Sequence, residues 1–131
     1  MVHVGTCCIL SSGDLFRKHG IKNIIHAVGP HYNKEKLKEN NDLLSKCIQN
    51  SILKANEHKL KSIAIPAISS GIFGYPKKAC AIVLLETIKQ YMLTDKEKIT
   101  RLIKLTNNDE ITCKEILEQA NHIITLEPPK L

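Results

Sequence analysis

Short apolar runs alternate along this chain with longer stretches in which apolar residues recur at helical spacing. The short runs near 4–10, 22–28, 62–66 and 101–105 are rich in β-branched residues and predict strands. The helical spacing predicts helices near 36–57, 77–92 and 110–121. Strands that alternate with helices are typical of an α/β domain with a largely parallel sheet and helices on both faces.

Length and composition favour one globular domain. The chain has 131 residues, 43% of them hydrophobic and 24% charged, which is ordinary for such a domain. We therefore expect a single domain over 1–131, with an irregular tail from about 125 that contains Glu127-Pro128-Pro129. No apolar run approaches the roughly 18 residues that span a bilayer, and no signal-peptide pattern opens the chain.

The cysteines indicate a reducing compartment. Five cysteines are scattered along the chain, an odd number without Cys-x-x-Cys spacing, so zinc is not expected. Free thiols predict an intracellular location, cytoplasmic or nuclear. Nothing in the pattern points to a metal or a resident cofactor.

The net charge of +6 would suit an anionic partner. Lysines and arginines are spread along the sequence without a long cluster, and aromatic residues make up only 4%. Proteins that bind single-stranded nucleic acid need aromatic stacking surfaces. The sequence therefore favours a solvated basic surface over a nucleic-acid interface, and it stays compatible with a diphosphate ligand.

The segment from Ser62 to Tyr91 carries the clearest chemical signal. It reads as a buried strand over 62–66, a loop of small residues over 67–75, and a helix opened by Pro76. Small residues let backbone approach a ligand closely, and a loop that ends at a helix N-terminus can bind an anion. An ordinary tight connection between strand and helix explains the same residues.

These residues resemble the macrodomain family of ADP-ribose-binding modules. The sequence Ser-Ile-Ala-Ile-Pro-Ala-Ile-Ser-Ser-Gly-Ile-Phe-Gly-Tyr-Pro at 62–76 is similar to the family's second phosphate loop. Upstream, Ile-Ile-His-Ala-Val-Gly-Pro at 24–30 is similar to a family strand that ends in Val-Gly-Pro. The resemblance implies a three-layer α/β/α fold with a mixed, mostly parallel sheet, and ADP-ribose as the ligand.

The resemblance also implies roles for individual residues. Backbone groups of the loop would contact the diphosphate and the distal ribose, and the strand end would shape the pocket wall. Tyr75 would flank the ribose, or it is a core aromatic that closes the loop. The implied ligand-binding residues are Ser69, Ser70, Gly71, Ile72, Phe73, Gly74, Tyr75, Val28, Gly29, Pro30 and Asn107.

Three residues have two interpretations each. Asn107 lies where the family places an adenine neighbour, although capping of the last helix by Asn107 or Asn108 explains it equally well. His26 is tempting as an acid or base, but its apolar strand favours a core histidine. Cys80 follows the loop, where a helix dipole lowers a thiol pKa, yet its apolar face favours core packing. No catalytic residue is assigned.

The chain departs from the family pattern in its N-terminal part. Family members carry an adenine-reading aspartate, an Asn-Ala-Asn segment, a Gly-rich first phosphate loop and a central strand between those at 24–28 and 62–66, and this sequence contains none of them. The resemblance thus implies an N-terminally truncated domain. Either the two strands pair directly and in parallel, another chain fills the slot, or the sequence is part of a longer protein. Unpaired buried backbone groups, at about 1–3 kcal/mol each, make an empty slot costly.

Three functions follow as hypotheses. The first is a module that binds ADP-ribose or a mono-ADP-ribosylated protein, weakened by the missing segments. The second is an ADP-ribosyl hydrolase, if a longer chain supplies those segments. The third is a macrodomain remnant that binds nothing and serves as a scaffold. The unpaired sheet edge also suggests self-association.

Overall fold

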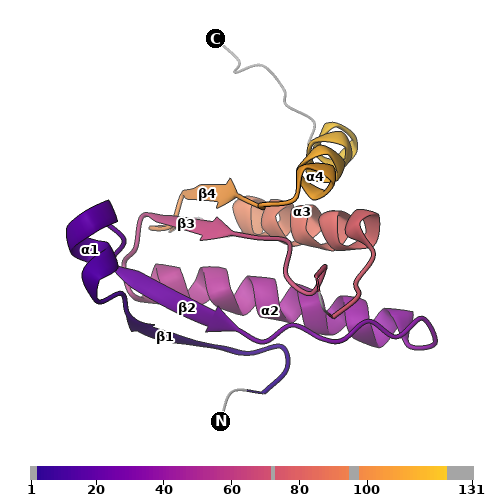
Figure 1. Ribbon diagram of the computed structural model, residues 1–131, viewed down its shortest axis with the longest axis horizontal. Helices are drawn as coiled ribbons and strands as arrows, with labels where there is room; N and C mark the ends of the chain where they lie inside the picture. The colour runs from indigo at the N-terminus through magenta and orange to yellow at the C-terminus, as the bar shows by residue number, and fades with distance from the viewer. Residues whose placement is uncertain (1–2, 72, 95–97, 124–131) are drawn as a thin grey trace.

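The computed structural model describes residues 3–71, 73–94 and 98–123. Within them the chain runs through alternating strands and helices, as the periodicity predicts (Figure 1). In chain order the elements are β1 (Cys7–Ser11), α1 (Asp14–His19), β2 (Asn23–Ala27), α2 (Leu37–Glu57), β3 (Ser62–Ile65), α3 (Lys77–Thr94), β4 (Leu102–Leu105) and α4 (Glu110–Ile123).

The strands form two separate two-stranded sheets. β1 pairs antiparallel with β2, with Cys7 opposite Ala27, and β3 pairs in parallel with β4, with Ser62 opposite Leu102. β2, β3 and β4 all run in the same direction (Figure 1). The segments that follow these three strands therefore gather at one end of the molecule.

Direct pairing between the strands near 24–28 and 62–66 is wrong for the described residues, because β2 and β3 belong to different sheets. No strand of the described chain lies between them in either sheet order. Helix α2 contacts β1, β2 and β3, so both sheets pack against the same helix. β2 and β3 are nevertheless not hydrogen-bonded to each other. One sheet is thus antiparallel and the other parallel, and the strand order is interrupted between β2 and β3.

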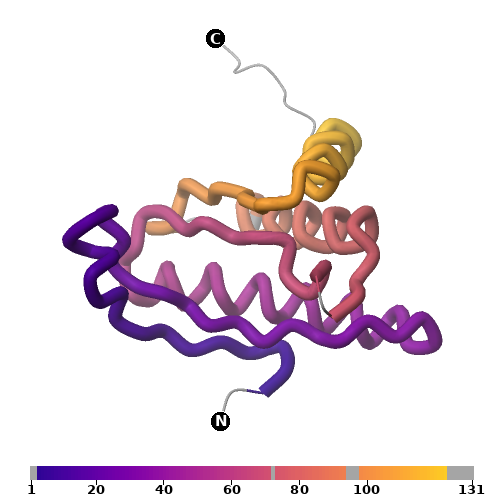
Figure 2. The backbone as a smooth tube through the Cα atoms, viewed as in Figure 1, coloured from indigo at the N-terminus to yellow at the C-terminus, as the bar shows by residue number. Residues whose placement is uncertain are grey.

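The core lies between α2, α3 and the β3 strand. α2 and α3 run side by side behind the strands, and α4 packs against α3 (Figures 1 and 2). Helix α3 is buried on two sides, because it contacts both α2 and α4. Its buried apolar residues are Cys80, Ala81, Leu84, Leu85, Ile88 and Tyr91. Core residues include Leu44, Ile48, Ile52, Ile65, Tyr75, Cys80, Leu84, Leu85 and Ile116.

The first strand and the first helix differ from the prediction. β1 begins at Cys7 rather than near residue 4, because Gly5 has a φ of 86° and Thr6 donates its amide to the His3 carbonyl in a turn. The polar segment after β1 forms helix α1, which ends at Gly20 in the left-handed conformation with a φ of 71°. The predicted tail from about 125 lies outside the described residues. No helix in the described ranges is long and apolar enough to cross a membrane.

Candidate anion site at the carboxyl ends of the strands

Three connections meet where β2, β3 and β4 end. They are the segment after β2, the loop from Ala67 to Pro76 after β3, and the turn from Thr106 to Asp109 after β4. Hydrogen bonds link them: Tyr32 donates its amide to the Phe73 carbonyl at 2.9 Å, and Thr106 donates to the Ile65 carbonyl at 3.0 Å. Ligands of open α/β sheets bind outside the carboxyl ends of the strands, so this end is the first place to look for a site.

The loop after β3 consists of two consecutive tight turns. The Ser70 amide donates to the Ala67 carbonyl at 3.2 Å, and the Gly74 amide donates to the Gly71 carbonyl at 3.0 Å. The Tyr75 amide closes the loop on the Ser69 carbonyl at 2.9 Å. Ser69 has a φ of 69° and Gly74 a φ of 76°, so both lie in the left-handed region that tight turns require. The loop is therefore fixed by its own backbone.

Several amides of this loop have no acceptor within the described chain. The backbone N–H groups of Ser69, Gly71 and Phe73 donate no hydrogen bond there, whereas those of Ser70, Gly74 and Tyr75 do. Successive N–H groups around a left-handed residue form a concave nest that binds anions. The loop also leads directly into α3, whose N-terminal partial positive charge favours an anion. Ile72, the remaining predicted contact of this group, lies outside the described residues.

The end of β2 forms a wall behind the loop. Val28 extends the β1–β2 ladder through bonds of 3.0 Å and 2.7 Å to Thr6 and Gly5, and Gly29 and Pro30 are buried. A Cβ at Gly29 would overlap Ser69 Oγ and would lie 2.6 Å from Ile68 Cγ2. Only glycine lets β2 approach the loop this closely.

Tyr75 is a core residue that closes the loop. Its side chain is 2% exposed, its ring meets Tyr32 edge-on at 5.2 Å, and its hydroxyl donates to Asn41 Oδ1 on α2. Burial, with smaller contributions from Cys80 and Tyr32, raises the pKa of Tyr75 to about 12. Of the two interpretations of Tyr75, the structure shows the packed aromatic, and it joins the loop to α2.

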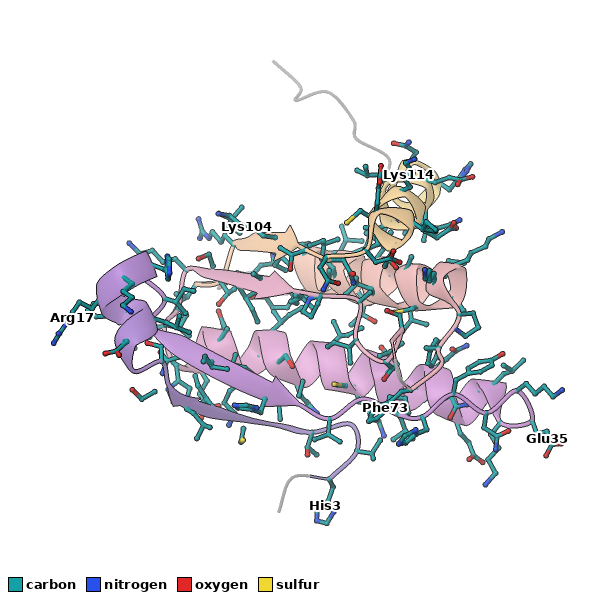
Figure 3. All side chains as sticks on the ribbon, in the orientation of Figure 1. His3, Arg17, Glu35, Phe73, Lys104 and Lys114 are labelled. Carbon is teal, nitrogen blue, oxygen red and sulfur yellow. The ribbon has the colours of Figure 1, made fainter. Side chains whose placement is uncertain are left out.

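Phe73 lies at the rim of the loop, beside the connection from β2 to α2 (Figure 3). Its ring stacks on His31 with centroids 3.8 Å apart and planes tilted by 31°. Together with the hydrogen bond between Tyr32 and Phe73, this stack joins the loop to the segment after β2. The aromatic pair forms an apolar edge beside the unpaired amides.

The turn after β4 borders an open hollow of 460 Å³, lined by Pro66, Thr106, Asn107 and Asn108. This volume lies in the range of small-molecule sites, about 300–1,000 Å³. The Asn107 side chain accepts a hydrogen bond from the Asp109 amide at 2.9 Å. Asp109, rather than Asn107 or Asn108, caps α4, because its carboxylate accepts from the Thr112 amide at 3.3 Å.

A charge pair fixes the turn after β4 to the start of α3. Lys77 Nζ lies 2.6 Å from Asp109 Oδ2, and the Thr112 hydroxyl donates to the same oxygen at 2.6 Å. The hydrogen bond from Lys77, followed by that from Thr112, lowers the pKa of Asp109 from 3.8 to about 2. The pair joins the first residue of α3 to the residue that caps α4.

The structure decides between the two interpretations of Cys80, and it contradicts the core interpretation of His26. Cys80 is fully buried, its thiol donates to the Ile68 carbonyl at 3.2 Å, and burial raises its pKa to about 12. The core interpretation of Cys80 is therefore confirmed. His26, predicted as a core histidine, is exposed on β2, because Ile25 and Ala27 take the inward positions of that strand. All five cysteines are free, and no group of three metal-ligating side chains occurs in the described ranges.

Sequence reasoning did not identify the partners that position the loop. Asn41 lies in a polar stretch of α2, and His31 lies in a connection, so neither carries a local signal of a role. Lys77 and Asp109 are separated by more than one element along the chain. The tight packing of Gly29 on Ser69 could have been suspected from the glycine that follows an apolar strand.

Comparison with known proteins relates this chain and its fold to one family. The profile of the Macro domain matches residues 1–84. An uncharacterised protein of Sulfurisphaera tokodaii is 34% identical over 133 residues, a match that covers 97% of this chain and 69% of that protein. The ADP-ribose glycohydrolase MACROD1 of Rattus norvegicus is 38% identical over 82 residues, which cover 63% of this chain and 32% of that enzyme.

A solved structure matches the whole arrangement. The Oceanobacillus iheyensis macrodomain with ADP superposes with a TM-score of 0.83 at 29% identity, covering 94% of this chain and 60% of that one. The chain thus spans less than two thirds of that structure and about a third of the rat enzyme.

Proposed function

Because the chain belongs to the macro domain family, we propose that it binds ADP-ribose, or an ADP-ribosyl group on a protein, through the loop over 69–75. The observation that carries the proposal is the set of amides at Ser69, Gly71 and Phe73 without an acceptor in the described chain, in a loop that its other backbone hydrogen bonds hold in place. A diphosphate supplies the acceptors that these groups lack. The similar macrodomain of Oceanobacillus iheyensis was solved with ADP, which carries the same diphosphate.

The rest of the ligand would lie on either side of the loop. The hollow at Pro66, Thr106, Asn107 and Asn108 would take one end of the molecule, and the Phe73 edge would take the other. Val28, Gly29 and Pro30 would act as the wall that holds the loop in place rather than as direct ligands, since the last two are buried. Tyr75 would not contact the ligand directly; its buried side chain would fix the position of the loop against α2.

Isothermal titration calorimetry with ADP-ribose, ADP and adenosine tests this function. We expect the two diphosphates to bind more tightly than adenosine, and Gly71→Glu to abolish binding, because a carboxylate would occupy the phosphate position. A Cβ at Gly71 meets no atom within 4 Å, so the fold should tolerate the change. Gln49→Glu on the exposed face of α2 alters the charge equally and should bind as the parent does. Unchanged binding by Gly71→Glu would refute the loop assignment.

A second candidate is the removal of ADP-ribose from proteins. It rests on the similarity to the rat enzyme named an ADP-ribose glycohydrolase. Turnover of a mono-ADP-ribosylated protein, measured beside the calorimetry, separates this candidate from simple binding. A chain that neither binds nor turns over ADP-ribose would leave the scaffold hypothesis standing.

We also propose that another chain adds a strand between β2 and β3, a second copy being the simplest source. The carbonyls of Lys61 and Ile65 accept bonds from the β4 side, at 3.1 Å and 3.0 Å. Because backbone groups alternate in direction along a strand, the N–H and C=O of Ala64 face the gap. Amide hydrogen exchange at Ala64 that slows as the protein concentration rises would support pairing. Fast exchange at every concentration, with a monomer by light scattering, would refute it.

A further inference from the structure

About half of the described basic residues, although dispersed in sequence, lie at one end of the molecule. Helix α1 and the residue before β2 contribute Arg17, Lys18 and Lys22, all exposed. The segments that lead into β3 and β4 contribute Lys59, Lys61, Lys98 and Arg101, and β4 itself contributes Lys104. All of them except the half-buried Lys98 are exposed. We call these two sets the basic end. They lie at the end of the molecule where β2, β3 and β4 begin, opposite the anion loop (Figure 1).

Backbone contacts place the second set together. The Arg101 amide donates to the Lys61 carbonyl at 3.1 Å, and Arg101 Nε donates to the Lys98 carbonyl at 2.9 Å. Lys104 is opposite Ala64, which is also exposed, so its side chain stands clear of the sheet. Figure 3 shows Lys104 and Arg17 projecting outward from this part of the molecule.

The charge of the basic end is not neutralised in the structure. None of its lysines or arginines forms an ion pair with a described residue, and Asp14 is the one described acid within α1. Elsewhere in the described chain, basic and acidic residues are equal in number, as in the pairs Lys54–Glu57, Lys77–Asp109 and Lys114–Glu110. Within the described residues, the excess of basic over acidic side chains therefore lies in the basic end.

We propose that the basic end binds the phosphate backbone of double-stranded nucleic acid without reading its sequence. A cluster of cations without ion-pair partners at one end of a domain is the electrostatic footprint of such a surface. Phe16 is the one aromatic side chain among the described residues of α1, β3 and β4, and it is 57% exposed. A single aromatic offers no stacking platform for successive bases, which favours a duplex over a single strand.

The test compares two triple variants with the same net charge. One replaces Lys61, Arg101 and Lys104 by glutamine; the control replaces Lys34, Lys36 and Lys38, which are exposed and flank Glu35 at the opposite end (Figure 3). Fluorescence anisotropy with a short labelled DNA duplex of mixed sequence is measured over a series of salt concentrations. We expect the first variant to bind at least about tenfold more weakly at low salt, with a salt slope reduced by roughly 2–3, and the control to match the parent.

Several outcomes would overturn the proposal. They are equal losses in both variants, no duplex binding by the parent at low salt, or tighter binding of a polyglutamate peptide of the same charge, which would point to an acidic protein instead. ADP-ribose calorimetry on a double variant with Lys61→Gln and Arg101→Gln should give the parent's result, because these residues precede β3 and β4 whereas the loop and the hollow follow them. The two proposals can therefore fail independently.

Discussion

Ser69 Oγ occupies the space that a Cβ on Gly29 would need, which leaves no room for a side chain at position 29. The same hydroxyl is buried and has no hydrogen-bond partner among the described residues. This contact joins the end of β2, which belongs to one sheet, to the loop that follows β3 in the other. It is where the two halves of the site meet, since β2 and β3 share no hydrogen bonds of their own.

Gly29→Ala should destabilise the fold by about 1–3 kcal/mol, because the added Cβ would overlap Ser69 Oγ and crowd Ile68. Urea unfolding of the variant and the parent measures the change. Gly71→Ala is the matched control, since its Cβ would meet nothing within 4 Å, and it should unfold like the parent. Equal stability of Gly29→Ala and the parent would contradict the close packing.

Ser69→Gly should leave stability unchanged or raise it by about 1 kcal/mol. The substitution removes the strain of a non-glycine residue in the left-handed region, where Ser69 has a φ of 69°, and it removes a buried hydroxyl without a hydrogen-bond partner among the described residues. These two stabilising effects offset the greater conformational freedom that glycine gives the unfolded chain. Ser70→Gly, the neighbouring control, should destabilise, because Ser70 Oγ donates to the Ala67 carbonyl at 2.6 Å. Urea unfolding measures the stability of both variants. If Ser69→Gly were less stable than Ser70→Gly, Ser69 would have a stabilising role.

Asp109 should make stability depend on pH in the acid range. Its pKa is lower in the folded protein, at about 2, than its ordinary value of 3.8, so its contribution is fully present above about pH 4 and is lost as the pH falls toward 2. Asp109→Asn keeps a cap for α4 but loses the ion pair with Lys77, so its stability should lie below the parent's at pH 7 and approach it near pH 2. A constant difference between the two proteins across this range would argue against the ion pair.

Cys80 and Cys47 should resist thiol reagents in the native protein. Both are fully buried, and burial raises their pKa values to about 12 and about 11, so very little thiolate forms at neutral pH. Mass spectrometry after brief alkylation should find label on the half-exposed Cys8 and Cys113 first, with Cys47 and Cys80 modified only in denaturant. If Cys80 were alkylated rapidly in the native protein, it would be a reactive thiol rather than a core residue.

The chain of residues 1–131 should bind ADP-ribose weakly and should not hydrolyse it. The resemblance to the family implies that its adenine-reading aspartate and its first phosphate loop are absent from this sequence. Each charge-assisted hydrogen bond contributes about 1.5–3 kcal/mol, and 1.4 kcal/mol is about tenfold in affinity, so two losses should weaken binding at least about a hundredfold. A sub-micromolar dissociation constant, or turnover of an ADP-ribosylated protein by this chain, would contradict the expectation.

The sequence by itself determined the order and type of the main elements and the position of the loop. Apolar periodicity over residues 36–57 or 77–92 reflects which side of a helix is buried. It therefore predicts the helix even when the elements that pack against it are unknown. The small residues of 69–74 indicate tight turns for an equally local reason, their freedom at Cβ and in φ. The short helix α1 was missed because six mostly polar residues carry no periodicity.

Only the tertiary structure decided which of these residues meet. The gap between β2 and β3, the packing of Ser69 on Gly29, the bond from Tyr75 to Asn41 and the pair of Lys77 with Asp109 all join positions in different elements. The gathering of dispersed lysines and arginines at one end is a fact of the same kind. Such contacts depend on how helices and strands pack across the whole chain, and local sequence pattern does not encode those distances.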